Sequence, residues 1–327
     1  MHDREPVSAC PIEDAVREEA LGVKFRRSAA LEALVSALEE PLVAPGDPTQ
    51  VAREKLEAVH GHPIAPETDV TWSERGGVRR AWVTTPESRP ERVLFLCHGG
   101  AFIAAGGDGY LFYAEMLARH CEARVLLVDY RLAPEHRFPT ALDDLVAAWQ
   151  EEIDAGLVPG QVAFIGDSCG GGLALAALVR LRDSGAPLPA GAITLGGWFD
   201  LEASGTAATH PLGRDPFAHA EFVRARARDY LGDAGDPRDP LASPVHADLT
   251  GLPPLLLQVG QVDLTRDDGL RVADRAGRAG VDVTLEIHPG CIHGFQGLAG
   301  AGIPEATDAL ARVRDWLTSK TGTASAE

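Results

Sequence analysis

A serine stands at the centre of the pattern Gly-x-Ser-x-Gly, which residues 166–170 form as Gly-Asp-Ser-Cys-Gly. The pattern follows an apolar run and precedes a segment of helical character. On so tight a turn, side chains two positions before and after the serine would collide, so glycine is needed at Gly166 and Gly170. The pattern predicts that Ser168 is a nucleophile. The alternative is an ordinary glycine-rich turn that carries a surface serine.

A serine hydroxyl is a poor nucleophile without a general base, so a histidine must lie within its reach. The segment EIHPGCIHGFQG, near the C-terminal end, contains His288 and His293. We prefer His293, because it lies in the loop after the predicted strand, where a side chain is free to reach. His288, at the end of that strand, is the alternative.

The acid that orients the histidine is expected between the serine and the histidine in the chain. The segment QVGQVDLTRDDG contains Asp263, Asp267 and Asp268. Asp263 is nearest the end of a predicted strand, whereas the other two fit the first turn of a helix, where the dipole alone favours carboxylates. Asp263 is therefore predicted to orient His293 and to stabilise its imidazolium.

A second glycine-rich stretch, HGGAFIAAGGDGY at residues 98–110, also follows an apolar run. It lacks the lysine of a phosphate-binding loop and the glycine spacing of a dinucleotide-binding loop. It fits a loop whose backbone N–H groups face the oxyanion formed during acyl transfer. In this loop, His98 is expected to be an organiser rather than a base.

These residues need a scaffold that gathers the ends of several strands. Six short, mostly apolar runs predict strands buried on both faces, as in a parallel sheet: residues 92–97, 124–129, 161–166, 191–196, 254–260 and 281–287. Helical segments separate most of these strands at the spacing of a βαβ unit. Between residues 196 and 254 an insertion is expected, with a helix over 215–233. Residues 68–85 predict an antiparallel hairpin that leads into the sheet.

The bulk composition is that of a globular chain of 327 residues, with 45% hydrophobic and 24% charged residues. A formal net charge of −18 disfavours binding to nucleic acid or to anionic membranes. The sequence contains no apolar run long enough to span a membrane and no secretory signal. Its five cysteines are widely spaced, which indicates reduced thiols and a cytoplasmic location.

Four sequence blocks resemble the hormone-sensitive-lipase-like (bacterial family IV) esterases of the α/β-hydrolase fold. They are HGGAF at 98–102, VDYRLAPEHRFPTALDD at 128–144, GDSCGGG at 166–172, and GQVDLTRDDG at 260–269 together with HGF at 293–295. More loosely, the chain is similar to actinobacterial ester and ε-lactone hydrolases of this family. It departs from the family pattern in two places, where Cys169 replaces the usual alanine and Ala101 stands where a third glycine often stands.

The resemblance implies a mostly parallel central sheet flanked by helices, with a helical cap. Residues 1–65 would form the N-terminal cap segment and residues 66–320 the catalytic domain. The domain would contain a cap insertion at about 200–235, and residues 321–327 would form a frayed tail. The implied catalytic triad is Ser168, Asp263 and His293, and the implied oxyanion hole is made by Gly99, Gly100, Ala101 and Cys169.

The expected activity is that of a serine carboxylic ester hydrolase acting on small-molecule esters or lactones with short- to medium-chain acyl groups. No metal or cofactor is expected, and a homodimer is possible. Phe25, Phe102 and Trp198 are candidates to line the substrate pocket, although core packing explains them equally well. Alternative functions are an amidase or deacetylase of the same family, and a non-catalytic receptor resembling the plant gibberellin receptors. Those receptors lack the triad histidine, so His293 argues against the second alternative.

Overall fold

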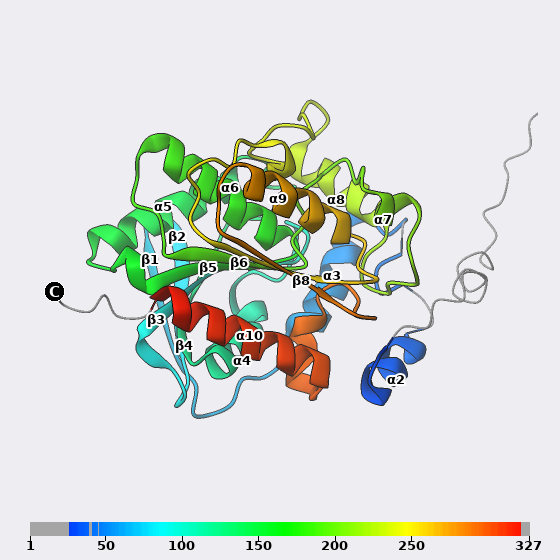
Figure 1. Cartoon of the computed structure of the whole chain (residues 1–327), viewed down its shortest axis with the longest axis horizontal. Coiled ribbons are helices and arrows are strands. Elements are labelled where there is room, and N and C mark those ends of the chain that lie inside the picture. The colour runs from blue at the N-terminus through cyan, green and yellow to red at the C-terminus, as the bar shows by residue number, and fades with distance from the viewer. Residues whose placement is uncertain (1–25, 39–40, 45, 322–327) are drawn as a thin grey trace, which may run out of the picture.

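A central sheet of eight strands forms the middle layer of the computed structural model (Figure 1), which describes residues 26–38, 41–44 and 46–321. Its spatial order is β1-β2-β4-β3-β5-β6-β7-β8, and β2 pairs antiparallel with both β1 and β4, whereas all other pairs are parallel. The strands span β1 Asp69–Arg75, β2 Val78–Thr84, β3 Arg89–Cys97, β4 Ala123–Asp129, β5 Val162–Asp167, β6 Gly191–Leu195, β7 Leu255–Gly260 and β8 Val283–His288.

Helices cover both faces of the sheet, as the apolar runs predict. Helices α4 (Leu111–Cys121) and α10 (Pro304–Thr321) lie on one face, and α5 (Thr140–Asp154), α6 (Cys169–Ser184) and α9 (Arg266–Arg278) lie on the other (Figure 1). Strands β5, β6 and β7 are buried along their whole length, which explains why their sequences do not alternate between apolar and polar residues. No described helix combines the length and the apolarity needed to cross a membrane.

All six apolar runs form strands, and the predicted hairpin is β1 with β2. The helix predicted over 215–233 is shorter, because α8 spans Ala220–Leu231. Two side chains account for the later start. Asp215 accepts the Phe217 N–H at 3.0 Å, and His219 caps the helix by accepting the Phe222 N–H at 3.2 Å. Both bonds hold the backbone before Ala220 outside the helix.

The segments predicted to form a cap contain α2 (Ala29–Ala37) and α3 (Thr49–His60) before the sheet, and α7 (Thr206–Thr209) and α8 in the insertion. These helices gather toward the right of Figure 1, beside one end of the sheet. Residues 1–25 and 322–327 lie outside the described residues. Thr321 was expected to fray, but it is buried in the last turn of α10 and its hydroxyl donates to the Leu317 carbonyl.

Four short 3-10 helices complete the described elements: η1 Gly107–Tyr110, η2 Pro159–Gln161, η3 Pro244–His246 and η4 Phe295–Ala301. The first follows the glycine-rich loop after β3, and the last follows the His293 loop after β8. Both loops leave the carboxyl ends of parallel strands, the edge where open α/β sheets bind their ligands.

Candidate active site

Ser168 occupies the tight turn between β5 and α6. Its backbone has φ 51° and ψ −125°, a strained conformation for a residue with a side chain. A Cβ atom at Gly166 would lie 2.2 Å from the Gly170 carbonyl oxygen, and one at Gly170 would lie 2.0 Å from the Cys97 carbonyl oxygen. Glycine is therefore required at both positions, the first by the turn itself and the second by the end of β3.

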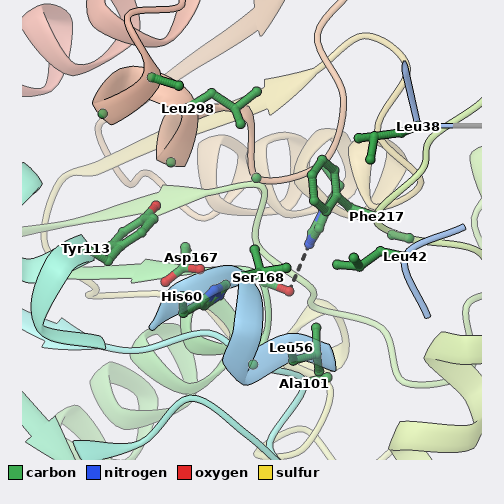
Figure 2. A pocket seen from close by; sticks show the side chains of 18 of the residues that line it. Leu38, Leu42, Leu56, His60, Ala101, Tyr113, Asp167, Ser168, Phe217 and Leu298 are labelled. Carbon is green, nitrogen blue, oxygen red and sulfur yellow. Dashed lines mark hydrogen bonds between the residues drawn. The ribbon is translucent and has the colours of Figure 1, made fainter. Parts of the chain in front are cut away.

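Ser168, His293 and Asp263 form one hydrogen-bonded chain. The distance from His293 Nε2 to Ser168 Oγ is 2.9 Å, the contact drawn as a dashed line in Figure 2, and the distance from His293 Nδ1 to Asp263 Oδ1 is also 2.9 Å. Asp263 is fixed in turn, because the same Oδ1 accepts the N–H of Thr265 at 2.7 Å and its hydroxyl at 2.9 Å. The three residues follow β5, β7 and β8, so the parallel sheet brings them together.

The sequence offers His288 as an alternative base and Asp267 and Asp268 as alternative acids, and in the structure all three side chains contact other groups. The His288 imidazole lies 3.6 Å from Glu286, and the carboxylate of Asp267 accepts the Ala207 N–H at 2.7 Å. The carboxylate of Asp268 accepts the N–H groups of Phe199 and Asp200 at 3.1 and 3.0 Å. These contacts assign all three side chains to structural bonds outside the Ser168–His293 pair.

Three carboxylates act on the His293 imidazole. Burial tends to lower the pKa of His293, but the negative charges of Asp263, Asp215 and Asp167 outweigh it and raise this pKa above its ordinary value. Asp215 did not emerge from the sequence. It lies in the insertion, and its Oδ2 accepts the backbone N–H of His293 at 2.8 Å. The site therefore favours the imidazolium that forms when His293 takes a proton.

The glycine-rich loop after β3 has a left-handed backbone at three successive residues, with φ 98° at Gly100, 54° at Ala101 and 66° at Phe102. A Cβ at Gly100 would lie 2.2 Å from the Ala104 carbonyl oxygen. The N–H groups of Ile103 and Ala104 both donate to the Gly100 carbonyl at 3.0 Å, which closes the turn. Gly100 and Ala101 line the same cavity as Ser168.

Gly99 differs from these neighbours, because it is not among the residues that line the cavity. Its N–H helps to stabilise the buried Asp167 carboxylate, and a Cβ at Gly99 would lie 2.3 Å from Asp167 Oδ2. The structure thus turns Gly99 toward Asp167, in contrast to its expected place in the oxyanion hole. His98 organises the loop as expected: its buried ring stacks on Tyr130 at 4.0 Å, and its Nδ1 lies 2.7 Å from the Gly99 carbonyl oxygen.

Cys169 begins α6 directly after the serine. Its Sγ accepts the backbone N–H of Phe102 at 3.2 Å, so the thiol ties the glycine-rich loop to the turn that carries Ser168. The side chains of Cys169 and Cys291 are buried, and burial raises the pKa of each thiol to about 12. Neither cysteine has the thiolate character that reaction with thiol reagents requires.

A cavity of about 1010 Å³ opens in front of Ser168. Figure 2 shows Leu38, Leu42, Leu56 and Phe217 on one side of Ser168 and His60, Tyr113 and Asp167 on the other. Most of the lining is apolar and comes from the N-terminal segment, α4, the loop after β6, the insertion and the loop around η4: Ala33, Leu34, Ala37, Leu38, Leu42, Leu56, Val59, Phe112, Trp198, Phe217, Ala218, Phe222, Val223, Leu298 and Ala301.

Of the three expected pocket residues, Trp198 lines the cavity. Phe102 does not: its ring stacks on Tyr230 with centroids 3.9 Å apart, so it packs in the core. Phe25 lies outside the described residues. His60 lines the cavity without having been predicted, and burial lowers the pKa of its imidazole to about 4.

One group in the described part of the chain has the donor atoms of a metal site, with ligand atoms of Asp200, Glu202 and His246 within 4.8 Å of one another. Arg271 already pairs with Asp200 at 2.6 Å, and Arg238 with Glu202 at 3.3 Å. None of the three donors lines the cavity in front of Ser168.

Comparison with known proteins agrees with this geometry. A family model described as alpha/beta hydrolase fold matches residues 94–297. An acetyl-hydrolase of Streptomyces hygroscopicus is 36% identical over 276 residues, which cover 84% of this chain and 91% of that protein. An esterase of Acinetobacter venetianus is 33% identical and covers 79% of this chain and 84% of its own. The crystal structure of an esterase from the bacterial hormone-sensitive lipase family superposes with a TM-score of 0.84 at 36% identity, covering 91% of this chain and all of that one.

The chain belongs to the bacterial hormone-sensitive-lipase-like esterases of the α/β-hydrolase fold. The predicted fold class is thereby confirmed. So is the predicted reaction class, because the chain is a carboxylesterase-type hydrolase. Family membership leaves the preferred ester open, and that choice depends on the cavity.

Proposed function

We propose that this esterase hydrolyses short- to medium-chain acyl esters or lactones through an acyl-enzyme formed on Ser168. His293 removes the proton of the Ser168 hydroxyl, and Oγ attacks the ester carbonyl carbon. The backbone N–H groups of Gly100, Ala101 and Cys169 hold the oxyanion, while Asp263 stabilises the imidazolium. His293 then gives its proton to the leaving alcohol, and a water molecule, deprotonated by His293, releases the acid.

The hydrogen-bonded chain Ser168–His293–Asp263 at the edge of an apolar cavity carries this proposal. Such a chain activates a serine for acyl transfer, and the left-handed backbone at Gly100 and Ala101 brings the loop to the same cavity. A cavity of about 1010 Å³ has more room than an acetyl group needs, which favours acyl chains of several carbons as well. A lactone presents the same carbonyl group in a ring.

We assign the described residues of the predicted 1–65 segment, together with residues about 200–235, to a cap over the catalytic domain, since helices α2, α3 and α8 from these segments supply cavity residues. A cytoplasmic location is supported by the described cysteines, all of which are free and buried. The proposed partner is a small-molecule ester or lactone, and a homodimer is a possible assembly.

The test is a substrate profile of the purified enzyme. We would measure kcat/KM on p-nitrophenyl esters from acetate to palmitate and on a panel of lactones. Mass spectrometry after rapid acid quenching would look for an acyl group on the peptide that contains Ser168. We expect the highest kcat/KM between acetate and octanoate, with a covalent acyl adduct. An optimum at palmitate, or turnover with no adduct, would contradict the proposal. Faster cleavage of matched anilides than of esters would favour the amidase alternative.

A further inference from the structure

Asp215 lies where the insertion meets the loop that carries the catalytic histidine. Its Oδ2 accepts the backbone N–H of His293 at 2.8 Å, and its Oδ1 accepts the backbone N–H of Phe217 at 3.0 Å. One carboxylate therefore fixes the main chain of the base and the main chain of Phe217, which lines the substrate cavity. The carbonyl of the intervening Pro216 accepts the Leu42 N–H at 2.9 Å, so the N-terminal segment is joined to the same point.

We propose that Asp215 is a second acidic positioning residue for His293, acting on the histidine backbone while Asp263 acts on the imidazole ring. This inference rests on the proposed role of His293 as the general base. Asp215 touches neither the substrate carbonyl nor Ser168 in this scheme. It holds the His293 loop at the distance that the Ser168 hydrogen bond needs, and it adds a negative charge beside the imidazole.

The negative charge of Asp215 can be detected through its effect on the pKa of His293. The carboxylates that raise the pKa of the imidazole, to about 9, are Asp263 after β7, Asp215 in the insertion and Asp167 at the end of β5. Burial raises the pKa of Asp215 and that of Asp167 to about 6, so both carry their negative charge over the pH range in which His293 titrates. The loop after β6 contributes no charge there, since it approaches the ring with Gly196. His60 of α3 faces the same cavity, but burial lowers its pKa to about 4, so it stays neutral over the range in which the esterase would be assayed.

Removing one carboxylate must lower the pKa of His293, because the imidazolium loses a favourable interaction. His293 works as a base only when it is neutral. The acidic limb of the pH profile of kcat/KM reports its pKa in the free enzyme. In Asp215→Asn this limb is expected to move toward lower pH by roughly half a pH unit or more, the effect of one unit charge at close range. Damage to the fold alone would lower activity without moving the limb in this direction.

The experiment compares three variants with the wild-type esterase on p-nitrophenyl butyrate between pH 5 and pH 10. Asp215→Asn removes the charge, and its amide can accept only one of the two N–H bonds, so kcat is expected to fall about tenfold together with the shift of the limb. Asp215→Glu keeps the charge and displaces it, so the limb should stay near the wild-type pH while kcat falls. Asp267→Asn is the matched control, since Asp267 also accepts a backbone N–H of the insertion, that of Ala207, and does not touch His293.

An acidic limb that stays in place in Asp215→Asn, or moves equally in Asp267→Asn, would overturn the proposal. If Asp215→Asn fails to fold, Asp215→Glu becomes the deciding variant. Because it keeps the negative charge, its acidic limb should stay near the wild-type pH, and a shift of roughly half a pH unit or more toward lower pH would contradict the proposal. Ser168→Ala and His293→Ala, assayed in parallel, test the underlying mechanism separately. Activity surviving in these two variants would refute the proposed function, whereas their inactivity with an unmoved limb in Asp215→Asn would refute only the role of Asp215.

Discussion

Ser168, Asp263 and His293 follow strands β5, β7 and β8 at one edge of the sheet, whereas Leu34, Leu42 and Phe217 on the opposite wall come from the N-terminal segment and the insertion. The first group stands in loops directly after parallel strands and is held by two hydrogen bonds of 2.9 Å. The second group stands on short helices and loops and meets the cavity through apolar contacts. The sheet edge is therefore suited to bond-making chemistry, and the opposite wall to the choice of acyl chain.

Ser168→Ala removes the nucleophile at the sheet edge and is expected to have the largest effect of the substitutions considered. Without the nucleophile, kcat is expected to fall on the order of 10³-fold or more, as for other triad deletions. The loss should be the same for acetate and octanoate esters, because the missing group acts on the carbonyl alone. Steady-state assays on both esters, with a thermal melt to verify folding, check this. Near-wild-type turnover by a folded variant would refute the role of Ser168.

Narrowing the opposite wall should have a smaller and selective effect. Ala33 on α2 lines the cavity, so Ala33→Trp fills space that a long acyl chain would occupy. We expect kcat/KM to fall about tenfold on octanoate, within the range for a misfitting apolar group, and to change less than about threefold on acetate. Ser36→Trp on the same helix is the control, since Ser36 is exposed and does not line the cavity. Equal losses on both esters would show that α2 supports the catalytic groups rather than chain selection.

The same contrast explains what could be predicted from the sequence. Ser168 carries a local signal, because the turn permits only glycine at two nearby positions. Asp263 and His293 lie in the loops after two apolar runs whose strands end at one edge. Their order in the chain limits the acid and the base to those loops, and their positions within the loops favour them over Asp267, Asp268 and His288. Asp215 has no such signal. It meets His293 across 78 residues of sequence, and that meeting depends on how the insertion packs on the sheet.

Two predicted site residues, Phe102 and Gly99, face away from the substrate cavity because of a backbone conformation that the sequence does not reveal. Phe102 was a pocket candidate, but with φ 66° the chain turns its ring onto Tyr230. Gly99 was an expected oxyanion donor, but its N–H faces the Asp167 carboxylate. Both lie in a loop rich in left-handed residues, where the direction of each group changes from one residue to the next. A glycine-rich pattern predicts such a loop without predicting which N–H groups face the substrate.

Cys169 offers a finer test of the sheet edge. Cys169→Ala leaves the buried N–H of Phe102 without its sulfur acceptor, and the glycine-rich loop loses a tie to the nucleophile turn. Since one hydrogen bond contributes about 1 kcal/mol, we expect kcat to fall roughly three- to fivefold on acetate and octanoate alike. Cys169→Ser, which keeps an acceptor, should lose less. A change confined to octanoate in either variant would assign the cysteine to chain selection instead.

Ala101→Gly should have the smallest effect and bears most directly on the border between the two regions. Ala101 supplies a backbone N–H to the proposed oxyanion hole, while its side chain lies at the cavity surface with only 6% exposure. Glycine adopts the φ of 54° without strain and keeps the N–H, so kcat on p-nitrophenyl acetate should stay within about threefold of wild type. The ratio of kcat/KM for octanoate to that for acetate should change more, because the removed methyl group forms part of the cavity wall. A hundredfold loss of kcat on the acetate ester would instead mean that the methyl group holds the glycine-rich loop in place. Ala101 would then support catalysis at the sheet edge rather than the choice of acyl chain.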